Sequence, residues 1–324
     1  MRRISYDQAI NETLHQMIEK DRRVFLIGQG VTSPWYVGTT TVGLIHRFGS
    51  KRIIDTPVSE NGITGVAIGA ALAGMRPILA HPRMDFMYYA MDQLANHAAN
   101  WHYMFGGQLS VPLTIWGIIN RGGEQAAQHS QALQAMFTHI PGLKVVMPST
   151  PYDAKGLLIA SIQDDNPVIY IDDRWLYNQV GEVPEELYSI PIGKGIIRRE
   201  GKDVTLAATS YMVSQAIEAA ESLIKESIDV EVVDIRSLKP LDEDLLFESV
   251  RKTGRLVTAD GGWKTCGVGA EISALIAEKA FGYLKAPIVR VSLPDAPAPA
   301  SSALERVYYP RAKDIISAIK RLLA

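Results

Sequence analysis

The sequence predicts an α/β protein made of two doubly wound domains. Its 324 residues are more than one typical domain requires. Apolar runs of strand length alternate with segments of helical periodicity, which is typical of parallel sheets covered by helices. A polar stretch with two prolines, residues 181–193, interrupts this alternation. We therefore expect one domain over residues 1–185 and a second over residues 186–324.

The first half begins with a helix start signal. Ser5 and Gln8 form a capping box, and apolar residues then recur at helical spacing. Further helices are expected over 61–73, which is rich in Gly and Ala, and over 153–162. The expected strands are 24–27, 53–54, 77–80, 113–116, 145–147 and 168–171.

The second half repeats the alternation after residue 193. The expected strands are 204–208, 230–235, 256–259 and 288–293, and the expected helices are 212–224, 243–250, 269–281 and 312–323. Doubly wound folds host many activities, so the function has to be argued from the site residues.

Composition excludes several classes of function. The formal net charge of -2 provides no field that would attract nucleic acid or an anionic membrane. Cys266 is the only cysteine, so an internal disulfide is impossible and a reducing, cytoplasmic setting is expected. The start of the chain lacks the apolar core of a signal peptide, and the apolar stretch 65–75 is too short to span a bilayer.

Common catalytic motifs are missing. The chain contains neither a Walker-type phosphate loop nor a dinucleotide-binding Gly-x-Gly-x-x-Gly after a strand. It also has no Gly-x-Ser-x-Gly elbow and no pair of histidines at zinc-binding spacing. These absences argue against serine hydrolases and zinc enzymes.

Three segments stand out instead. Residues 55–62 (Asp-Thr-Pro-Val-Ser-Glu-Asn-Gly) follow a strand and precede the Gly-rich helix. Residues 85–93 form an aromatic cluster entering a helix, and residues 126–131 contain Gln-His-Ser-Gln. The first segment lies where an open α/β sheet faces its ligand crevice.

These segments closely resemble the beta subunit of pyruvate dehydrogenase, a first component of the 2-oxo acid dehydrogenases. Matching motifs continue through 69–77, 141–154 and 252–255, so the resemblance covers essentially the whole chain. Residues 103–107 and 137–141 look most like the acetoin dehydrogenase branch. The resemblance implies an N-terminal pyrimidine-binding, transketolase-like domain and a C-terminal transketolase-type domain.

It also implies thiamine diphosphate as the cofactor, with Glu60 as the carboxylate that binds the ring nitrogen of its aminopyrimidine. The alternative is that Glu60 is only a first-turn acid favoured by the helix dipole. Phe86 is expected to stack on the pyrimidine, although it could be a plain core aromatic. Gln29 and Tyr89 complete the expected cofactor-binding set.

His129, in the Gln-His-Ser-Gln motif, matches the family histidine near the reacting carbonyl, where an imidazole can donate or accept a proton. Its alternative is a structural histidine. Asp164 and Asn166 match a family segment that binds a monovalent cation such as potassium, and a simple turn is the alternative there.

The magnesium ligands of this family are absent. The expected Gly-Asp-Gly followed by Asn-Asn does not occur, and Ala259-Asp260-Gly261 has no asparagine after it. The diphosphate and its magnesium therefore lack protein ligands in this chain. We expect an alpha subunit to supply them in an alpha2-beta2 heterotetramer.

Three functions remain open from the sequence. The first is decarboxylation of a 2-oxo acid, or cleavage of an acetoin-like donor, followed by transfer to a lipoyl arm, with a lipoyl acyltransferase as a further partner. The second is a transketolase-like or carboligase enzyme that transfers a two-carbon unit to an aldehyde or keto sugar. The third is a silent assembly subunit, against which the presence of Glu60, Phe86 and His129 argues.

Departures from the family put the substrate in doubt. Gln29-Gly30 replaces two acids, residues 80–83 read Ala-His-Pro-Arg, and Trp116 stands where an arginine is common. Asp295 replaces the histidine that acetoin-type enzymes carry after the last strand.

Overall fold

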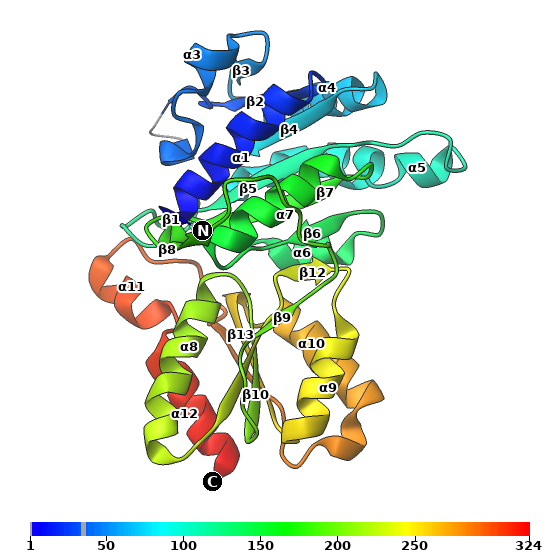
Figure 1. Cartoon of the computed structure of the whole chain (residues 1–324). Coiled ribbons are helices and arrows are strands. Elements are labelled where there is room, and N and C mark those ends of the chain that lie inside the picture. The colour runs from blue at the N-terminus through cyan, green and yellow to red at the C-terminus, as the bar shows by residue number, and fades with distance from the viewer. Residues whose placement is uncertain (1, 34–36) are drawn as a thin grey trace. The chain divides into compact units, whose positions relative to one another are not determined.

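The computed structural model describes residues 2–33 and 37–324, and it divides into two compact units (Figure 1). Unit 1 comprises Met1–Arg121 and Met136–Ile192, and unit 2 comprises Gly122–Ala135 and Gly193–Ala324. The sequence pattern did not predict that residues 122–135 would group with the second unit. The domain boundary expected after residue 185 stays a prediction.

Unit 1 is built on parallel strands in the order β6-β7-β5-β4-β2-β3. Their bounds are β2 (Val24–Gln29), β3 (Ile53–Thr56), β4 (Arg76–His81), β5 (Thr114–Ile119), β6 (Lys144–Val146) and β7 (Val168–Asp173). These strands are near-continuous apolar runs because both faces of a parallel sheet are buried. Every strand expected from the sequence in this unit is present, and most extend one to three residues further.

The three helices expected in the first half are present as α1 (Tyr6–Lys20), α4 (Glu60–Leu72) and α7 (Pro151–Gln163), while α3 (Leu44–Phe48), α5 (Trp101–Met104) and α6 (Gln134–His139) were not expected. The capping box at Ser5 is confirmed, since its backbone N–H donates to Gln8 Oε1 at 3.0 Å. The Gly-rich helix is also confirmed, one residue earlier than expected. Unit 1 also contains the 3-10 helices η1 (Gly38–Thr41) and η4 (Arg174–Leu176).

The aromatic cluster departs from a regular helix. It forms a 3-10 segment, η2 (Met84–Ala90), followed by a π-helical segment, η3 (Asp92–Ala98). Both pack against α4. Such tight and wide turns are common where a chain has to present side chains at a site.

The polar stretch 181–193 was expected to be an irregular linker between the domains, and this is wrong at its start. Val180–Val183 forms β8, which pairs antiparallel with β1 (Arg2–Ser5). The segment is held by the buried Lys155, whose Nζ donates to the carbonyls of Pro184 and Glu185 at 2.8 and 2.9 Å. The sequence did not reveal this strand, because its alternation of apolar and polar residues is too short to stand out among the neighbouring charged residues and prolines.

Unit 2 contains a second sheet in the order β14-β13-β10-β11-β9, parallel except for the edge strand β9. Helices α8 and α12 cover one face and α9 and α10 the other (Figure 1), so the doubly wound α/β prediction is confirmed. The strands β9 (Ile196–Arg199) and β12 (Ser237–Lys239) and the helix α11 (Ser302–Tyr308) were not expected. The remaining elements are β10 (Val204–Ala208), α8 (Tyr211–Leu223), η5 (Ile224–Glu226), β11 (Val230–Asp234), α9 (Glu243–Thr253), β13 (Leu256–Trp263), α10 (Val268–Lys279), η6 (Phe281–Tyr283), β14 (Val289–Leu293) and α12 (Ala312–Leu323).

Within residues 2–33 and 37–324, none of the helices combines the length and the apolar character needed to cross a bilayer.

Candidate active site

The carboxyl ends of the unit 1 strands gather most of the expected cofactor-binding residues. Gln29 at the end of β2 lies beside Thr56 at the end of β3. Helix α4 starts four residues after β3, and η2 starts three residues after β4. Loops that leave the carboxyl edge of a parallel sheet are the usual ligand-binding positions of such folds.

Glu60 is the first residue of α4 and is partly buried. Its backbone carbonyl accepts the Thr64 hydroxyl at 2.6 Å, but its carboxylate has no hydrogen bond or ion pair within the described part of the chain. The helix N-terminus favours a negative charge at this position. A partly desolvated carboxylate that the protein leaves unpaired can accept a hydrogen bond from a ligand nitrogen.

Aromatic rings lie close to this helix start. The rings of Phe86 and Tyr89 stack with centroids 6.5 Å apart and planes at 21°. The Asn61 amide, next to Glu60, donates to the backbone carbonyl of Tyr89 at 3.3 Å, and Gln93 Nε2 donates to Asn61 Oδ1 at 3.3 Å. The start of α4 and the aromatic segment are therefore joined directly, and they present an acid and a flat apolar surface together.

Asp55 organises the loop after β2, a role that the sequence analysis missed. Its Oδ1 accepts the Gly30 N–H at 2.7 Å, and its Oδ2 accepts the Thr32 N–H at 3.2 Å and the Thr32 hydroxyl. These bonds fix the chain that follows Gln29. An acid immediately after a buried strand, one residue before the Thr-Pro pair, was the available signal.

His81 lies beneath the Glu60 helix rather than in the site. It is fully buried at the end of β4, and its Nε2 is 3.4 Å from the Thr64 hydroxyl. Burial lowers the pKa of His81 to about 4, so the imidazole is neutral at physiological pH. The structure favours the packing role for this histidine.

Two buried acids, Asp172 and Asp173, lie at the carboxyl end of β7. The Tyr177 hydroxyl donates to Asp172 Oδ2 at 3.0 Å, and Arg121 Nε pairs with Asp173 Oδ2 at 2.6 Å with both side chains fully buried. Burial raises the pKa of Asp172 to about 7, although the hydrogen bond from Tyr177 acts to lower it. The sequence analysis ended this strand at residue 171 and overlooked the two acids.

His129 belongs to the segment Gly122–Ala135, which groups with unit 2. It is partly exposed. Five residues further along the chain, Gln134 Nε2 donates to Asp260 Oδ1 at 2.8 Å, which anchors the segment to β13. The catalytic role of His129 stays a prediction.

The residues expected to bind a monovalent cation lie at the end of α7. Asp164 Oδ1 accepts the Asn166 N–H at 2.9 Å, and Asp164 Oδ2 pairs with Lys144. Arg76 Nη1 donates to the carbonyls of Ile162 and Asp164 at 3.1 and 3.0 Å. Because cationic side chains engage these oxygens, the residues as arranged do not fit an added cation, and the site remains only a prediction.

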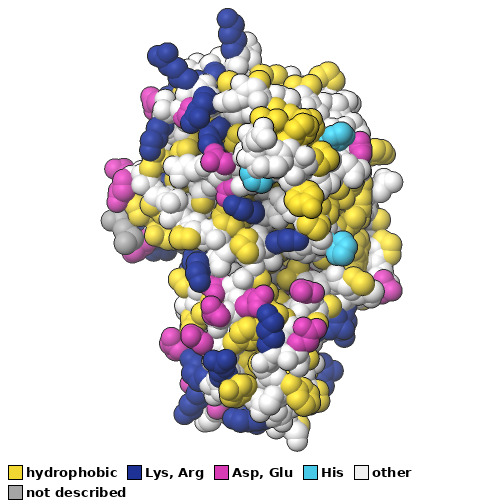
Figure 2. All heavy atoms as spheres, turned by 90° about the vertical axis from the view of Figure 1, so that its right-hand side faces the viewer, with side chains coloured by type: hydrophobic (Ala, Val, Ile, Leu, Met, Phe, Trp, Pro, Cys, Tyr) yellow, Lys and Arg dark blue, Asp and Glu magenta, His cyan; other side chains and the backbone are white. Residues whose placement is uncertain are grey.

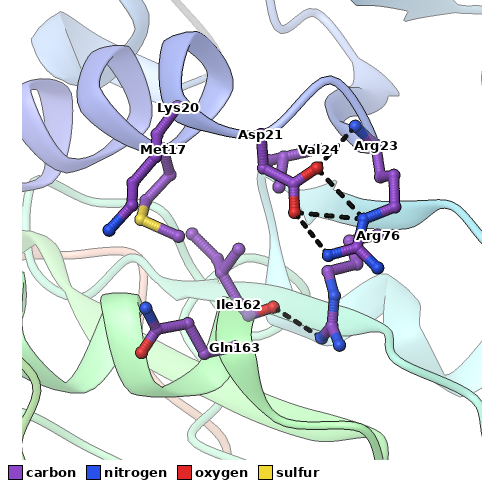
Figure 3. Close-up of a pocket in the computed structure, with 8 residues that line it drawn as sticks. All are labelled: Met17, Lys20, Asp21, Arg23, Val24, Arg76, Ile162 and Gln163. Carbon is purple, nitrogen blue, oxygen red and sulfur yellow. Dashed lines mark hydrogen bonds and ion pairs between the residues drawn. The ribbon is translucent and has the colours of Figure 1, made fainter.

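A surface pocket of about 390 Å³ lies beside this point, lined by residues at the ends of α1 and α7 (Figure 3). In its wall Asp21 and Arg23 form a two-pronged ion pair, and Arg76 donates to the Ile162 carbonyl. The pocket lies where β2 and β4 begin, at the opposite ends of these strands from Glu60. We do not assign it a ligand.

Among the described residues, no group of three or more His, Cys, Asp or Glu side chains could hold a metal ion. The site thus fits one part of the implied cofactor: an unpaired acid and aromatic rings suit a pyrimidine. It offers no cluster of acidic ligands for a diphosphate-bound metal.

Two family models match the two halves of the chain. Residues 2–179 match the family model for the transketolase pyrimidine-binding domain, and residues 193–315 match the model for the transketolase C-terminal domain. A solved structure described as a split-gene transketolase, an inactive beta4 tetramer, superposes with a TM-score of 0.81 at 25% identity, covering 99% of this chain and 98% of that one.

Curated relatives are more similar in sequence. The beta subunit of acetoin:2,6-dichlorophenolindophenol oxidoreductase from Bacillus subtilis is 45% identical, over 99% of this chain and 97% of the relative. The pyruvate dehydrogenase E1 component beta subunit is 42% identical in Rickettsia felis, over 98% of both chains. The mitochondrial beta subunit of Bos taurus is 45% identical, over 99% of this chain and 90% of the relative. The chain therefore belongs to the transketolase-like family of beta subunits of pyruvate and acetoin dehydrogenases.

Proposed function

We propose that this chain is the beta subunit of a two-subunit thiamine-diphosphate enzyme that decarboxylates a 2-oxo acid, or cleaves an acetoin-like donor. The acyl or aldehyde fragment then passes to an acceptor such as a lipoyl arm. The proposal is carried by one observation: Glu60 lies next to the Phe86–Tyr89 stack. The hydrogen bond from Asn61 to Tyr89 holds the two together, and the Glu60 carboxylate has no hydrogen-bond partner among the described residues.

Thiamine diphosphate, when bound, supplies the carbon nucleophile for this chemistry. The residues of this chain bind the pyrimidine ring of the cofactor and hold its orientation. The Glu60 carboxylate would accept a hydrogen bond from the protonated ring nitrogen of the pyrimidine, and the Phe86 ring would cover one face of the pyrimidine and exclude water. Exclusion of water strengthens the hydrogen bond to the carboxylate, because the local dielectric falls. Gln29 and Tyr89 complete the rim, and His129 moves a proton at the substrate oxygen.

The transketolase-like alternative has weaker support. The identity to pyruvate and acetoin dehydrogenase beta subunits is 42–45% over nearly the whole chain, against 25% for the split-gene transketolase. The fold does not determine which acceptor the enzyme uses. The transketolase-like function is therefore tested in the same experiment as the main proposal.

The missing half of the site is assigned to a partner. An alpha subunit supplies the ligands for magnesium and the diphosphate, and the assembly is an alpha2-beta2 heterotetramer. A lipoyl acyltransferase is the further partner if the acceptor is a lipoyl arm. A cytoplasmic location belongs to this proposal as well. A potassium ion at Asp164 and Asn166 does not, because Lys144 already pairs with Asp164.

The test is reconstitution with the alpha partner, followed by a screen of pyruvate, longer 2-oxo acids and acetoin. Each donor is offered with an artificial electron acceptor, with a lipoyl domain and with a sugar aldehyde. Turnover of a 2-oxo acid or acetoin with the artificial acceptor supports the proposal. Turnover confined to a ketose donor and an aldehyde acceptor would replace it with the transketolase-like function.

A further inference from the structure

The segment Gly122–Ala135 carries His129 and is fixed to unit 2 near its start. The Glu124 N–H donates to Glu305 Oε1 at 3.0 Å, and Glu124 Oε1 accepts the N–H of Ser302, the first residue of α11, at 3.0 Å. These bonds hold Glu124 at a φ of 61°, in the left-handed region that residues other than glycine rarely adopt. Such a conformation persists only where its surroundings hold it. The start of the segment therefore has a defined position on unit 2.

A second anchor lies on β13, at Asp260. Its Oδ1 accepts both Gln134 Nε2 and the Thr209 hydroxyl at 2.8 Å, and all three side chains are buried. On the face of unit 2 seen in Figure 2, by contrast, acidic and basic side chains are interspersed at the surface. A carboxylate removed from water requires hydrogen bonds in place of its hydration, and such charge-assisted bonds are strong. Asp260 therefore binds the end of the segment firmly.

The sequence leaves room for this anchor at Gly262. A Cβ at that position would lie 2.8 Å from Gln134 Nε2 and 3.1 Å from Asp260 Oδ2, closer than a side chain ordinarily approaches. The absence of a side chain at Gly262 thus allows the amide to reach the carboxylate. Asp260 belongs to the Ala-Asp-Gly sequence that resembles part of a magnesium motif, and here one of its oxygens makes an internal contact instead.

Both anchors matter for His129 because of its place between them. His129 is five residues after Glu124 and five residues before Gln134. A stretch of five residues that is attached at one end alone can carry an imidazole over roughly 17 Å. Proton transfer requires heavy atoms about 3 Å apart. Attachment on both sides is therefore needed to keep the imidazole within reach of one reacting oxygen.

We propose that Asp260 is a positioning residue for His129: through Gln134 it fixes to unit 2 the segment that presents the imidazole to the substrate oxygen. The inference rests on the proposed function, from which it takes the proton transfer by His129. It adds a role for unit 2 in the reaction and names the buried acid through which unit 2 exerts it.

The first test measures the two half-reactions in the complex with the alpha partner. Asp260→Ala removes the anchor, Asp260→Asn keeps an acceptor oxygen, and Gly262→Ala pushes the Gln134 amide aside. We expect Asp260→Ala and Gly262→Ala to lower transfer to a lipoyl domain by about 10- to 100-fold, the range for a misplaced catalytic group, while reduction of an artificial electron acceptor is largely kept. Asp260→Asn should retain most of the transfer. Unchanged transfer in both Asp260→Ala and Gly262→Ala would overturn the proposal.

Combination with His129→Ala distinguishes positioning from a general loss of stability. If Asp260 acts through His129, Asp260→Ala should cost no further transfer once the imidazole is gone. Asp234→Ala is the matched control, since Asp234 is a fully buried acid at the end of β11 that pairs with Arg198. The control should leave the ratio of the two rates unchanged with and without His129. An equal loss of transfer from Asp260→Ala in both backgrounds would also overturn the proposal.

A further measurement does not depend on turnover. Amide hydrogen exchange of the pure chain, followed by mass spectrometry, should be faster over residues 122–135 in Asp260→Ala and Gly262→Ala, and unchanged over α12. Wild-type exchange of the segment in both variants would refute the anchor. If the segment exchanges faster while the complex acts on no 2-oxo acid or acetoin, the proposed function fails and the anchoring by Asp260 stands.

Discussion

The Asn61 side-chain amide donates a 3.3 Å hydrogen bond to the backbone carbonyl of Tyr89. This bond links the first turn of α4 to the 3-10 segment η2, which are 28 residues apart in the chain. Glu60 is the neighbour of one partner and Phe86 lies on the same segment as the other. The bond therefore sets the spacing between the acid and the aromatic rings of the candidate site.

Asn61→Ala should impair the site more than the fold. Loss of one partly exposed hydrogen bond costs about 0.5–1.5 kcal/mol of stability. Because the aromatic segment is then less well held, we expect a higher KM for thiamine diphosphate in the reconstituted complex, with turnover at saturation largely kept. The control is Asn96→Ala, which removes a 2.7 Å bond to Asp92 elsewhere on the same face. A control with the same rise in KM would show that Asn61 has no special positioning role.

Glu60→Gln should abolish most of the turnover and leave assembly intact. The amide keeps the volume of the side chain but removes the negative charge that the pyrimidine proton requires. We expect a loss of about 10²–10⁴-fold in kcat, the range for a positioned acid-base group. Glu271→Gln, an exposed first-turn acid of α10, is the control and should retain full activity. Near-normal turnover in Glu60→Gln would reduce Glu60 to a helix-start residue.

The isolated chain should bind thiamine diphosphate weakly. Its described residues offer a pyrimidine surface but no acidic cluster for the diphosphate-bound magnesium, and the charged end of the ligand contributes much of the binding energy. Isothermal calorimetry of the pure chain with magnesium present should therefore detect no micromolar binding, and addition of the alpha partner should restore it. Magnesium-dependent micromolar binding to the chain alone contradicts the split site.

The sequence predicted the regular parts of the fold well, because they depend on local patterns. The strands Val24–Gln29 and Val204–Ala208 are continuous apolar runs, and α1 begins at a capping box. The sequence did not predict the strands that exist only because they pair with a distant segment. Strand β8 exists because β1, at the other end of unit 1's sequence, bonds to it, and β9 is an antiparallel edge strand of charged and apolar residues.

The candidate site was predictable only as far as motif and strand end coincide. Glu60 was assigned to the cofactor from the family resemblance, since its position after β3 at the start of a helix is explained equally well by the helix dipole, and its role stays a prediction. The roles of Asp55 and Asp172 could not be predicted, because they depend on which groups the fold brings to their carboxylate oxygens. The partners of Asp55, for example, are 23–25 residues away in the chain. His129 has a distinctive motif, but the grouping of its segment with unit 2 arises from tertiary contacts that no local pattern encodes.

Stability should fall as pH rises from about 4 to about 7 because of Asp172. Burial raises its pKa from an ordinary 3.8 to about 7, so the folded chain holds this proton over a range in which the unfolded chain has lost it. The difference corresponds to about 4 kcal/mol. His81 acts in the opposite direction, since its pKa is lowered to about 4 and the unfolded chain binds the proton below about 6.5.

Urea unfolding of the wild type and of Asp172→Asn between pH 5 and 8 separates the two groups. The Asn variant should keep only the His81 contribution, so its stability should rise relative to the wild type as the pH increases. His81→Phe should show the reverse, with a steeper fall than the wild type. Parallel curves for the wild type and Asp172→Asn would mean that Asp172 titrates in its ordinary range.

The last prediction separates the two half-reactions at His129. Donor activation depends on the cofactor and Glu60, so His129→Ala should still consume a 2-oxo acid or acetoin at a measurable rate with an artificial electron acceptor. Transfer to the natural acceptor requires a proton to be delivered to or removed from the substrate oxygen, and an imidazole can both donate and accept a proton. We therefore expect a much larger loss in transfer to a lipoyl domain than in dye reduction. His139→Ala, an exposed histidine at the end of α6, is the control and should keep both rates. Equal losses in the two half-reactions would mean that His129 only positions the substrate, and no loss in either would make the Gln-His-Ser-Gln motif structural.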